Sequence, residues 1–389
     1  MACPAMSNPA TRELLADLIA FATVSRDSNL ALIDYVQRYL ARYGIDSEMI
    51  ADASGEKANL LAVIGPQDRP GIVLSGHTDV VPVSGQQWHS DPFVLRETNG
   101  KLFGRGTADM KSWLAAVLAL VPQLIAQPLR MPVWIAFSHD EEVGCKGVPT
   151  LLARLAQKTL PALCLVGEPT EMRPVFGHKG KIALRCEVTG HAAHSAYTPQ
   201  GVNAIEYAVR IIQSLMTLAE RLKQERNPGF DPPFSTLQTG VIHGGEALNI
   251  VPERCWFDFE IRSLPGVSVQ PLVDEIIHWS QQHLLPEMRQ IAVGCDITFT
   301  PLSHYPGLQT QAATTLEQVL ALLPPPAAVN TVAFGTEGGL FQQLGIPTLI
   351  CGPGSMAQGH KADEFVSLPQ LAACDTFLAD LCCWLREPT

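Results

Sequence analysis

The sequence has no excess of positive charge, no paired CxxC cysteines and no apolar run of membrane-spanning length. Its 389 residues carry a formal net charge of -11 at pH 7, which argues against a nucleic acid or an anionic membrane as a partner. Charged residues make up only 17% and hydrophobic residues 47%, so the chain can fill a sizeable core and extended disorder is not expected. The longest apolar stretch, residues 113–126, is shorter than the ~18 residues that a spanning helix needs.

The ten cysteines are scattered, most of them inside apolar runs such as residues 162–166. That distribution is typical of free, buried thiols in a reducing compartment and not of a disulfide scaffold. Residues 1–15 lack the basic flank and the continuous apolar core of a signal peptide. We therefore expect a cytoplasmic protein.

The length favours two domains, at ~150 residues each. Apolar runs alternate with segments of helical spacing, which predicts an α/β fold with a mainly parallel sheet covered by helices. The runs lie at 59–64, 71–74, 131–137, 162–166 and 347–351, with helices that include 111–120 and 148–155. We predict that this domain comprises residues 1–180 and 302–389.

Residues 181–301 follow a different order, β-α-β-β-α-β, which is the split βαβ arrangement of a small α+β sandwich. The expected elements are strands at 181–188, 236–242, 255–261 and 290–300, and helices at 205–215 and 269–283. We interpret this segment as an inserted domain.

Imidazoles and carboxylates follow the apolar runs where the strands are expected to end: His77 and Asp79, Glu141 and Glu142, Glu168, and His360, with Asp109 just before a helix. Ligand sites of open parallel sheets lie beyond the carboxyl ends of the strands. Each motif alone has an ordinary explanation, because a His-x-Asp pair is usually only hydrogen-bonded and an acidic triplet usually forms a solvated loop. Their joint placement favours a metal-dependent hydrolase.

This mixed nitrogen and oxygen ligand set, without thiolates, suits zinc, cobalt or manganese. Five ligands are too many for one catalytic ion with open positions, but they suit two ions that share a bridging carboxylate. Asp79 stands two residues after His77, a spacing that fits a carboxylate holding the imidazole in its metal-binding tautomer.

Four segments, at residues 75–82, 104–111, 140–144 and 167–170, resemble the successive signatures of the M20 metallopeptidase family. The resemblance extends from about Leu14 to Phe365 and implies a metal-dependent aminopeptidase-like catalytic domain. One departure is Ser112-Trp113, where many members carry two glycines. Because it follows the motif of Asp109, it concerns the shape of the pocket more than the metal site.

The resemblance implies two divalent ions, most simply zinc, with cobalt also compatible. It makes Asp109 the bridging ligand, with His77 and Glu168 on one ion and Glu142 and His360 on the other. Glu141 matches the general base of the family, which takes a proton from the attacking water and passes it to the leaving amine.

The resemblance also implies a homodimer formed through the inserted domain. His194, in the motif at 190–196, matches a histidine that enters the neighbouring active site and stabilises the oxyanion; the alternative is a loop histidine without a role. Asn249 and Arg262 stand where family members hold the substrate carboxylate, although Arg262 could instead form an ion pair within its sheet.

The closing segments, 334–341 and 351–365, resemble the acetylornithine deacetylase branch of the family. The implied reaction is hydrolysis of N2-acetyl-L-ornithine to ornithine and acetate, a step of arginine biosynthesis. We interpret Glu337, in a glycine-rich loop, as a carboxylate that pairs with the ammonium of this substrate. Three alternatives stay open: another N-acylamino-acid hydrolase such as succinyl-diaminopimelate desuccinylase or aminoacylase, a dipeptidase, and a metal-binding scaffold without catalysis.

Overall fold

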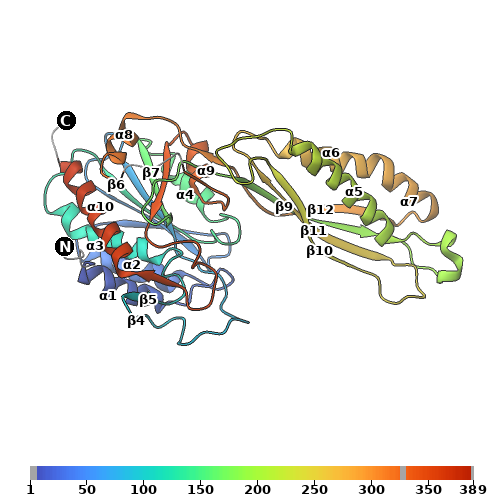
Figure 1. Cartoon of the computed structure of the whole chain (residues 1–389), viewed down its shortest axis with the longest axis horizontal. Coiled ribbons are helices and arrows are strands. Elements are labelled where there is room, and N and C mark those ends of the chain that lie inside the picture. The colour runs from blue at the N-terminus through green and yellow to red at the C-terminus, as the bar shows by residue number, and fades with distance from the viewer. Residues whose placement is uncertain (1–6, 325–329, 387–389) are drawn as a thin grey trace. The chain divides into compact units, whose positions relative to one another are not determined.

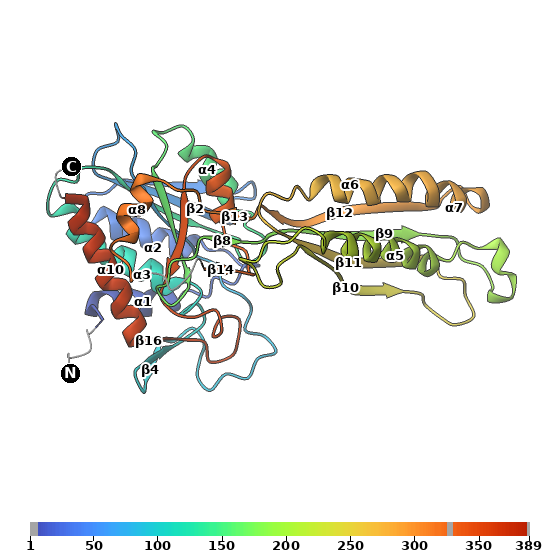
Figure 2. The ribbon, with the colours of Figure 1, turned by 45° about the horizontal axis from the view of Figure 1, so that its top comes forward.

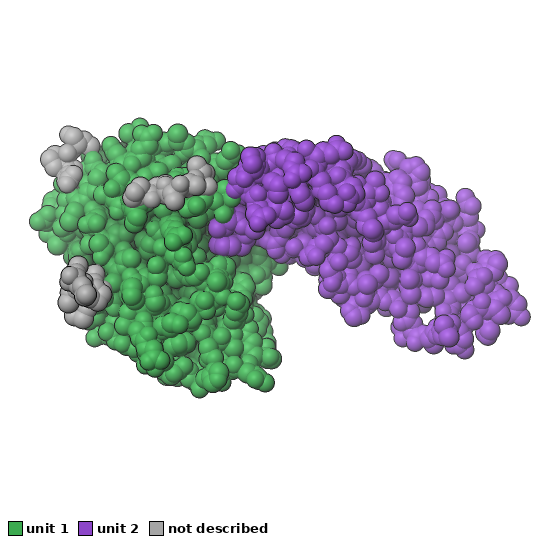
Figure 3. Space-filling model, viewed as in Figure 1, with its two compact units in different colours: residues 1–177, 308–331, 336–389 green, residues 178–307, 332–335 purple. Residues whose placement is uncertain are grey.

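The computed structural model describes residues 7–324 and 330–386 and divides the chain into two compact units (Figure 3). Unit 1 comprises Met1–Gly177, Leu308–Thr331 and Thr336–Thr389, and unit 2 comprises His178–Gly307 and Val332–Gly335. Each unit has a hydrophobic core of its own.

Unit 1 is built on a six-stranded sheet in the order β1-β2-β6-β3-β7-β15. Its strands are β1 (Ser47–Ala51), β2 (Ala58–Ile64), β3 (Ile72–His77), β6 (Val133–Ser138), β7 (Leu163–Pro169) and β15 (Thr348–Gly352). The pairs among β6, β3, β7 and β15 are parallel, whereas β1 and β2 are joined antiparallel at one edge. The prediction of a mainly parallel sheet is confirmed, and the antiparallel edge was not foreseen.

Helices cover both faces of this sheet (Figure 1). One face packs on α1 (Pro9–Ile19), α2 (Leu30–Ala41), α3 (Lys111–Ile125), α8 (Thr314–Leu320) and α10 (Leu368–Arg386), whose apolar side chains share one core. The other face carries α4 (Val148–Leu155) and α9 (Gly338–Gln343). Strands β3, β6, β7 and β15 are buried at every position, as expected for a sheet covered on both sides.

Two further sheets consist of short strands. One has the order β16-β5-β4 and contains β16 (Phe365–Ser367), β5 (Lys101–Phe103) and β4 (Arg96–Thr98). The other has the order β13-β8-β14 and contains β13 (Leu308–Gln309), β8 (Gly177–His178) and β14 (Thr331–Val332). Neither was predicted, because runs of two or three residues carry little periodicity.

Unit 2 is an antiparallel four-stranded sheet, in the order β10-β11-β9-β12, with helices on one face (Figure 2). Its elements in chain order are β9 (Gly180–Thr189), the 3-10 helix η1 (Ser195–Gln200), α5 (Ala204–Leu222), β10 (Thr236–Gly244), β11 (Arg254–Ser263), α6 (Gln270–Trp279), the π-helical turn η2 (Ser280–Leu284), α7 (Leu285–Ile291) and β12 (Asp296–Tyr305). This is the predicted β-α-β-β-α-β order.

The last strand of unit 2 differs from the prediction. A strand was expected at 290–300, but Gln290 and Ile291 end helix α7 and the strand begins at Asp296. Ile291 and Val293, within the predicted range, are 48% and 87% exposed. Leu284, Leu285 and Met288 are buried instead, at the spacing of a helix that packs on a sheet.

The remaining expectations concern cysteines and membranes. The nine cysteines in the described part of the chain are all free thiols, eight of them buried and Cys383 exposed. No helix within the described ranges combines the length and the apolar character that crossing a bilayer requires.

Candidate two-metal active site

The parallel strands of unit 1 end at one edge of the sheet, and the predicted ligands gather there. His77 is the last residue of β3, and Glu168 lies near the end of β7. Asp109 lies just before α3, while Glu142 and His360 lie in the loops that follow β6 and β15. Five separate segments of the chain therefore contribute one ligand each.

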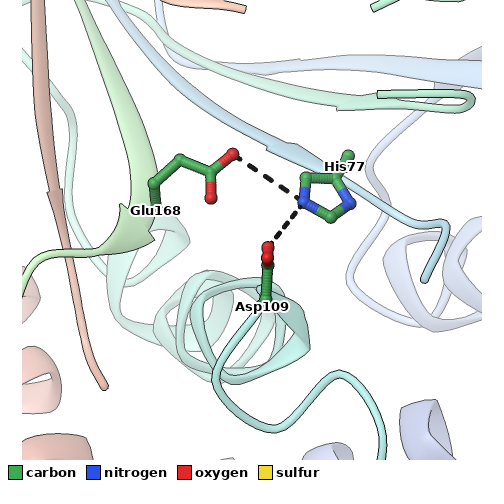
Figure 4. Close-up of side chains that lie close together, drawn as sticks. All are labelled: His77, Asp109 and Glu168. Atoms are coloured by element: carbon green, nitrogen blue, oxygen red, sulfur yellow. Dashed lines mark hydrogen bonds and ion pairs between the residues drawn. The ribbon is translucent and has the colours of Figure 1, made fainter. Parts of the chain in front are cut away.

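The first ligand set consists of His77, Asp109 and Glu168 (Figure 4). Nε2 of His77 lies 3.0 Å from Oδ1 of Asp109 and 3.7 Å from Oε1 of Glu168. All three side chains are buried, and one ligand atom from each lies within 4.8 Å of the others.

The second set consists of Asp109, Glu142 and His360. Nε2 of His360 lies 3.1 Å from Oδ2 of Asp109 and 3.0 Å from Oε2 of Glu142. Asp109 thus presents one carboxylate oxygen to each set, which is the arrangement of a bridging ligand. The side chain of His360 is 49% exposed, so the second set is the more open of the two.

The electrostatics of the cluster favour added positive charge. Burial raises the pKa of Glu142 to about 7, and burial next to Asp109 raises the pKa of Glu168 well above its usual range. Hydrogen bonds with Asp109 and Glu142 raise the pKa of His360 to about 10. Each shift reflects carboxylates that lack compensating charge, and two divalent cations would supply that charge.

The donor set therefore fits two divalent ions. Nδ1 of His77 lies 2.8 Å from the main-chain oxygen of Asp79; a proton on Nδ1 donated to this oxygen leaves the lone pair of Nε2 free for a metal. Imidazole and carboxylate ligands in two sets of three, with one shared carboxylate, suit two-metal hydrolytic sites.

Asp79 acts on more than the imidazole. Its carboxylate lies 3.6 Å from Nδ1 of His77, so the hydrogen bond predicted for the carboxylate is accepted by the main-chain oxygen of Asp79. The carboxylate instead accepts hydrogen bonds from the hydroxyl of Ser25 at 2.7 Å and from the backbone N–H groups of Glu141 and Glu142 at 3.1 and 3.3 Å. Asp79 therefore fixes the loop that carries the predicted general base.

Glu364 is a positioning residue that the sequence did not single out. Its carboxylate accepts hydrogen bonds from Arg105 Nη1 at 2.6 Å and from the backbone N–H groups of Gly106, Ala108 and Asp109 at 2.8–3.0 Å. Arg105 and Glu364 are each 1% exposed. This contact joins the segment of candidate ligand Asp109 to the segment of candidate ligand His360.

Trp113, the departure from the family pattern, lies in the core and does not line an open pocket. It is fully buried, directly behind two of the ligand-bearing strands. A Cβ on Gly167 would come within 2.0 Å of the Trp113 ring, and one on Gly76 within 3.1 Å. Glycine at 167 therefore lets β7 pass over the ring next to Glu168.

Glu337 is not open to a substrate ammonium in this structure. It is 1% exposed, and its carboxylate accepts hydrogen bonds from the hydroxyls of Ser75, at 2.9 Å, and Ser138. Burial raises its pKa. The interpretation that Glu337 contacts the substrate directly needs correction, because both of its oxygens are engaged inside unit 1.

The remaining predicted residues lie in unit 2. His194 is exposed at the start of η1, and its Nδ1 accepts a hydrogen bond from the N–H of Ala196 at 3.1 Å. Asn249 is exposed in the loop between β10 and β11. Arg262, on β11, donates to Glu260 Oε1 at 3.1 Å and to the Tyr305 hydroxyl at 2.8 Å, so the ion pair within the sheet is present.

The fold and the two ligand sets define a metal-dependent hydrolase. The chain belongs to the peptidase family M20/M25/M40, whose model matches residues 73–383. Its family and its relatives make it a metal-dependent amidohydrolase. The M20 resemblance found in the sequence is thereby confirmed.

Relatives with high coverage carry one common name. The chain is 35% identical to an acetylornithine deacetylase of Proteus mirabilis over 371 residues, covering 92% of each protein. It is also 35% identical to an acetylornithine deacetylase of Myxococcus xanthus over 377 residues, covering 95% of this chain and 96% of the relative.

Solved structures share the fold at lower identity. An M20 family metallo-carboxypeptidase of Sulfolobus solfataricus has a TM-score of 0.78 at 16% identity, covering 95% of this chain and 99% of that one. A dinuclear metal-binding M20 peptidase of Bacillus subtilis has a TM-score of 0.60 at 15% identity, covering 96% and 97%.

Proposed function

We propose that this chain uses two metal ions to hydrolyse N2-acetyl-L-ornithine to L-ornithine and acetate. The observation that carries the proposal is the pair of ligand sets that share Asp109, with the buried carboxyl group of Glu141 close enough to His77, Asp109 and Glu142 to interact with them electrostatically. Relatives that match more than 90% of the chain are named acetylornithine deacetylases, which supports the substrate.

His77, Asp109 and Glu168 would hold one ion, and Asp109, Glu142 and His360 the other. Zinc is the expected ion, with cobalt compatible, because both accept imidazole and carboxylate ligands. When bound, the ions would lower the pKa of the attacking water and polarise the amide carbonyl.

Glu141 acts as general base and then as general acid. In the metal-free cluster, burial and the nearby carboxylates of Glu142 and Asp109 raise its pKa well above the usual range. A carboxylate held beside the two ions, but not bound to them, can take a proton from the attacking water. It then delivers that proton to the nitrogen of the leaving amine. Asp79 holds the backbone of Glu141 during both steps.

Unit 2 provides the lid and the dimer interface in this proposal, and His194 acts in the active site of a second copy. With Nδ1 accepting from Ala196, the neutral imidazole carries its proton on Nε2. That N–H is the donor an oxyanion needs. The substrate carboxylate would accept hydrogen bonds from Asn249 and from Arg262. Arg262 would use the guanidinium hydrogens that do not bond to Glu260 or Tyr305.

The proposal places the protein in the cytoplasm and its reaction in arginine biosynthesis. The free, buried cysteines support a reducing compartment. Acetyl removal yields free ornithine, which fits the name of the relatives.

A substrate panel tests the proposal. The purified, metal-loaded protein is assayed on N2-acetyl-L-ornithine, N-succinyl-diaminopimelate, N-acetylmethionine and a dipeptide, with Glu141→Gln as a metal-binding but inactive control. The highest kcat/KM is expected on acetylornithine. A higher value on the succinylated compound or the dipeptide would assign a different family activity, and two bound ions without hydrolysis of any amide would favour a scaffold.

A further inference from the structure

Cys145 lies in the same loop as the proposed general base and contacts it. Its Sγ lies 3.4 Å from Oε1 of Glu141, as a donor to that oxygen. The backbone joins the same two residues, since the N–H of Cys145 donates to the carbonyl of Glu141 at 2.9 Å. The thiol is therefore held next to the carboxylate by a closed turn of the chain.

The backbone conformation of Cys145 is one that glycine adopts more readily than cysteine. Its φ is +55°, in the left-handed region where glycine is strongly favoured and other residues are uncommon. Gly144 and Gly147 stand close by in the same loop, yet position 145 carries a side chain that is 2% exposed. The buried side chain at this position makes an interaction that glycine could not make, the contact of Sγ with Glu141.

The chemistry of the thiol suits this contact. Burial, together with the carboxylates of Glu141 and Glu337, raises the pKa of Cys145 well above its usual range, so the group stays protonated and remains a donor. A thiol is a weaker donor than a hydroxyl. It can orient a carboxylate while leaving most of the basicity that a general base requires.

We propose that Cys145 is a positioning residue for the reaction: its S–H engages Oε1 of Glu141 and turns Oε2 toward the attacking water. This inference rests on the proposed amide hydrolysis, because it gives Cys145 a role only through Glu141. Without the thiol, the carboxylate can rotate away from the geometry for proton transfer while the five ligands stay in place.

Kinetics of Cys145 variants test the inference, with Cys374→Ala as the matched control. Cys374 is also a fully buried thiol of unit 1, but it lies in α10. Cys145→Ala is expected to lower kcat roughly tenfold, with KM and metal content unchanged, whereas Cys374→Ala keeps the wild-type kcat. Cys145→Ser, which restores a donor, should recover part of the loss, because the hydroxyl orients the carboxylate but lowers its basicity more than the thiol does.

Cys145→Gly separates this role from a role in folding. Glycine suits the positive φ, so the variant should fold even if Cys145→Ala does not, and its kcat should fall as far. Wild-type kcat in a folded, metal-loaded Cys145→Gly or Cys145→Ala protein would overturn the inference and leave the hydrolase function standing. A wild-type protein that hydrolyses no amide would overturn the proposed function, and this inference with it.

Infrared spectroscopy gives a readout that does not depend on activity. The S–H stretching band of Cys145 is assigned as the band lost in Cys145→Ser. Because hydrogen bonding lowers this frequency, the band should move to higher frequency in Glu141→Ala. A band that stays in place would show that the thiol does not donate to Glu141, which would overturn the inference.

Discussion

Replacing Glu364 with glutamine probes the contact that joins two ligand-bearing segments. The carboxylate accepts from Arg105 and from the N–H groups of Gly106, Ala108 and Asp109. The amide of glutamine has one acceptor oxygen, so its NH2 group must face either Arg105 and Gly106 or Ala108 and Asp109. In both orientations two donors lose their acceptor.

The size of the effect follows from burial. Arg105 is 1% exposed, and removing the partner of a buried charge costs about 3–5 kcal/mol. We therefore expect Glu364→Gln to lower the free energy of unfolding of the metal-free protein by that amount, measured by denaturant titration with tryptophan fluorescence. Loss of a contact that supports metal ligands typically weakens metal binding by about 10- to 100-fold, which calorimetric titration with zinc would measure.

Glu337→Gln is the matched control, because Glu337 is equally buried but bonds to Ser75 and Ser138 and not to the segment of Asp109. We expect its metal affinity to stay within about threefold of wild type, a smaller change than the loss of about 10- to 100-fold that is typical of residues that support ligands. Wild-type zinc affinity in Glu364→Gln, or equal losses in both variants, would refute the reasoning.

Four further outcomes are expected. Glu141→Gln should lower kcat by about 10²- to 10⁴-fold while two ions stay bound; loss of an ion would make Glu141 a ligand. His194→Ala should lower kcat with unchanged metal content, and near wild-type turnover would remove His194 from the mechanism. Glu337→Gln should change kcat/KM for acetylornithine and for N-acetylmethionine by the same factor. A loss on acetylornithine alone would support direct pairing of Glu337 with the substrate ammonium. Burial lowers the pKa of His178 from 6.5 to about 4, so the folded state disfavours its protonation, and about 3 kcal/mol of stability present above pH 6.5 should be lost as the pH falls toward 4. Urea titrations of wild type and His178→Asn should show this loss only in wild type, and parallel pH profiles would contradict it.

The sequence predicted the place of the candidate ligands because four of them follow apolar strands, whereas Asp109 stands just before helix α3. His77 and Glu168 end long buried runs, and parallel strands bring such ends to one edge. His360 lies farther from its strand, in the loop that follows β15. The motif at 351–365 identified it in the sequence.

The residues that support the ligands could not be predicted in the same way. Glu364 bonds to segments more than 250 positions away along the chain, and no local pattern encodes that pairing. Cys145 stands between Gly144 and Lys146, outside the apolar runs, and its residue type did not indicate a contact with Glu141. Its role depends on a turn with positive φ, and nothing in the residue type signals that turn.

The measurement that tests the central claim most directly is metal content together with activity. After chelation and dialysis, the protein is titrated with zinc, and bound metal and acetylornithine hydrolysis are followed together in wild type and in Asp109→Asn. The account predicts two ions per wild-type chain, activity that appears as metal binds, and loss of both in the variant. A single bound ion at saturation, or hydrolysis that persists in the metal-free protein, would contradict it.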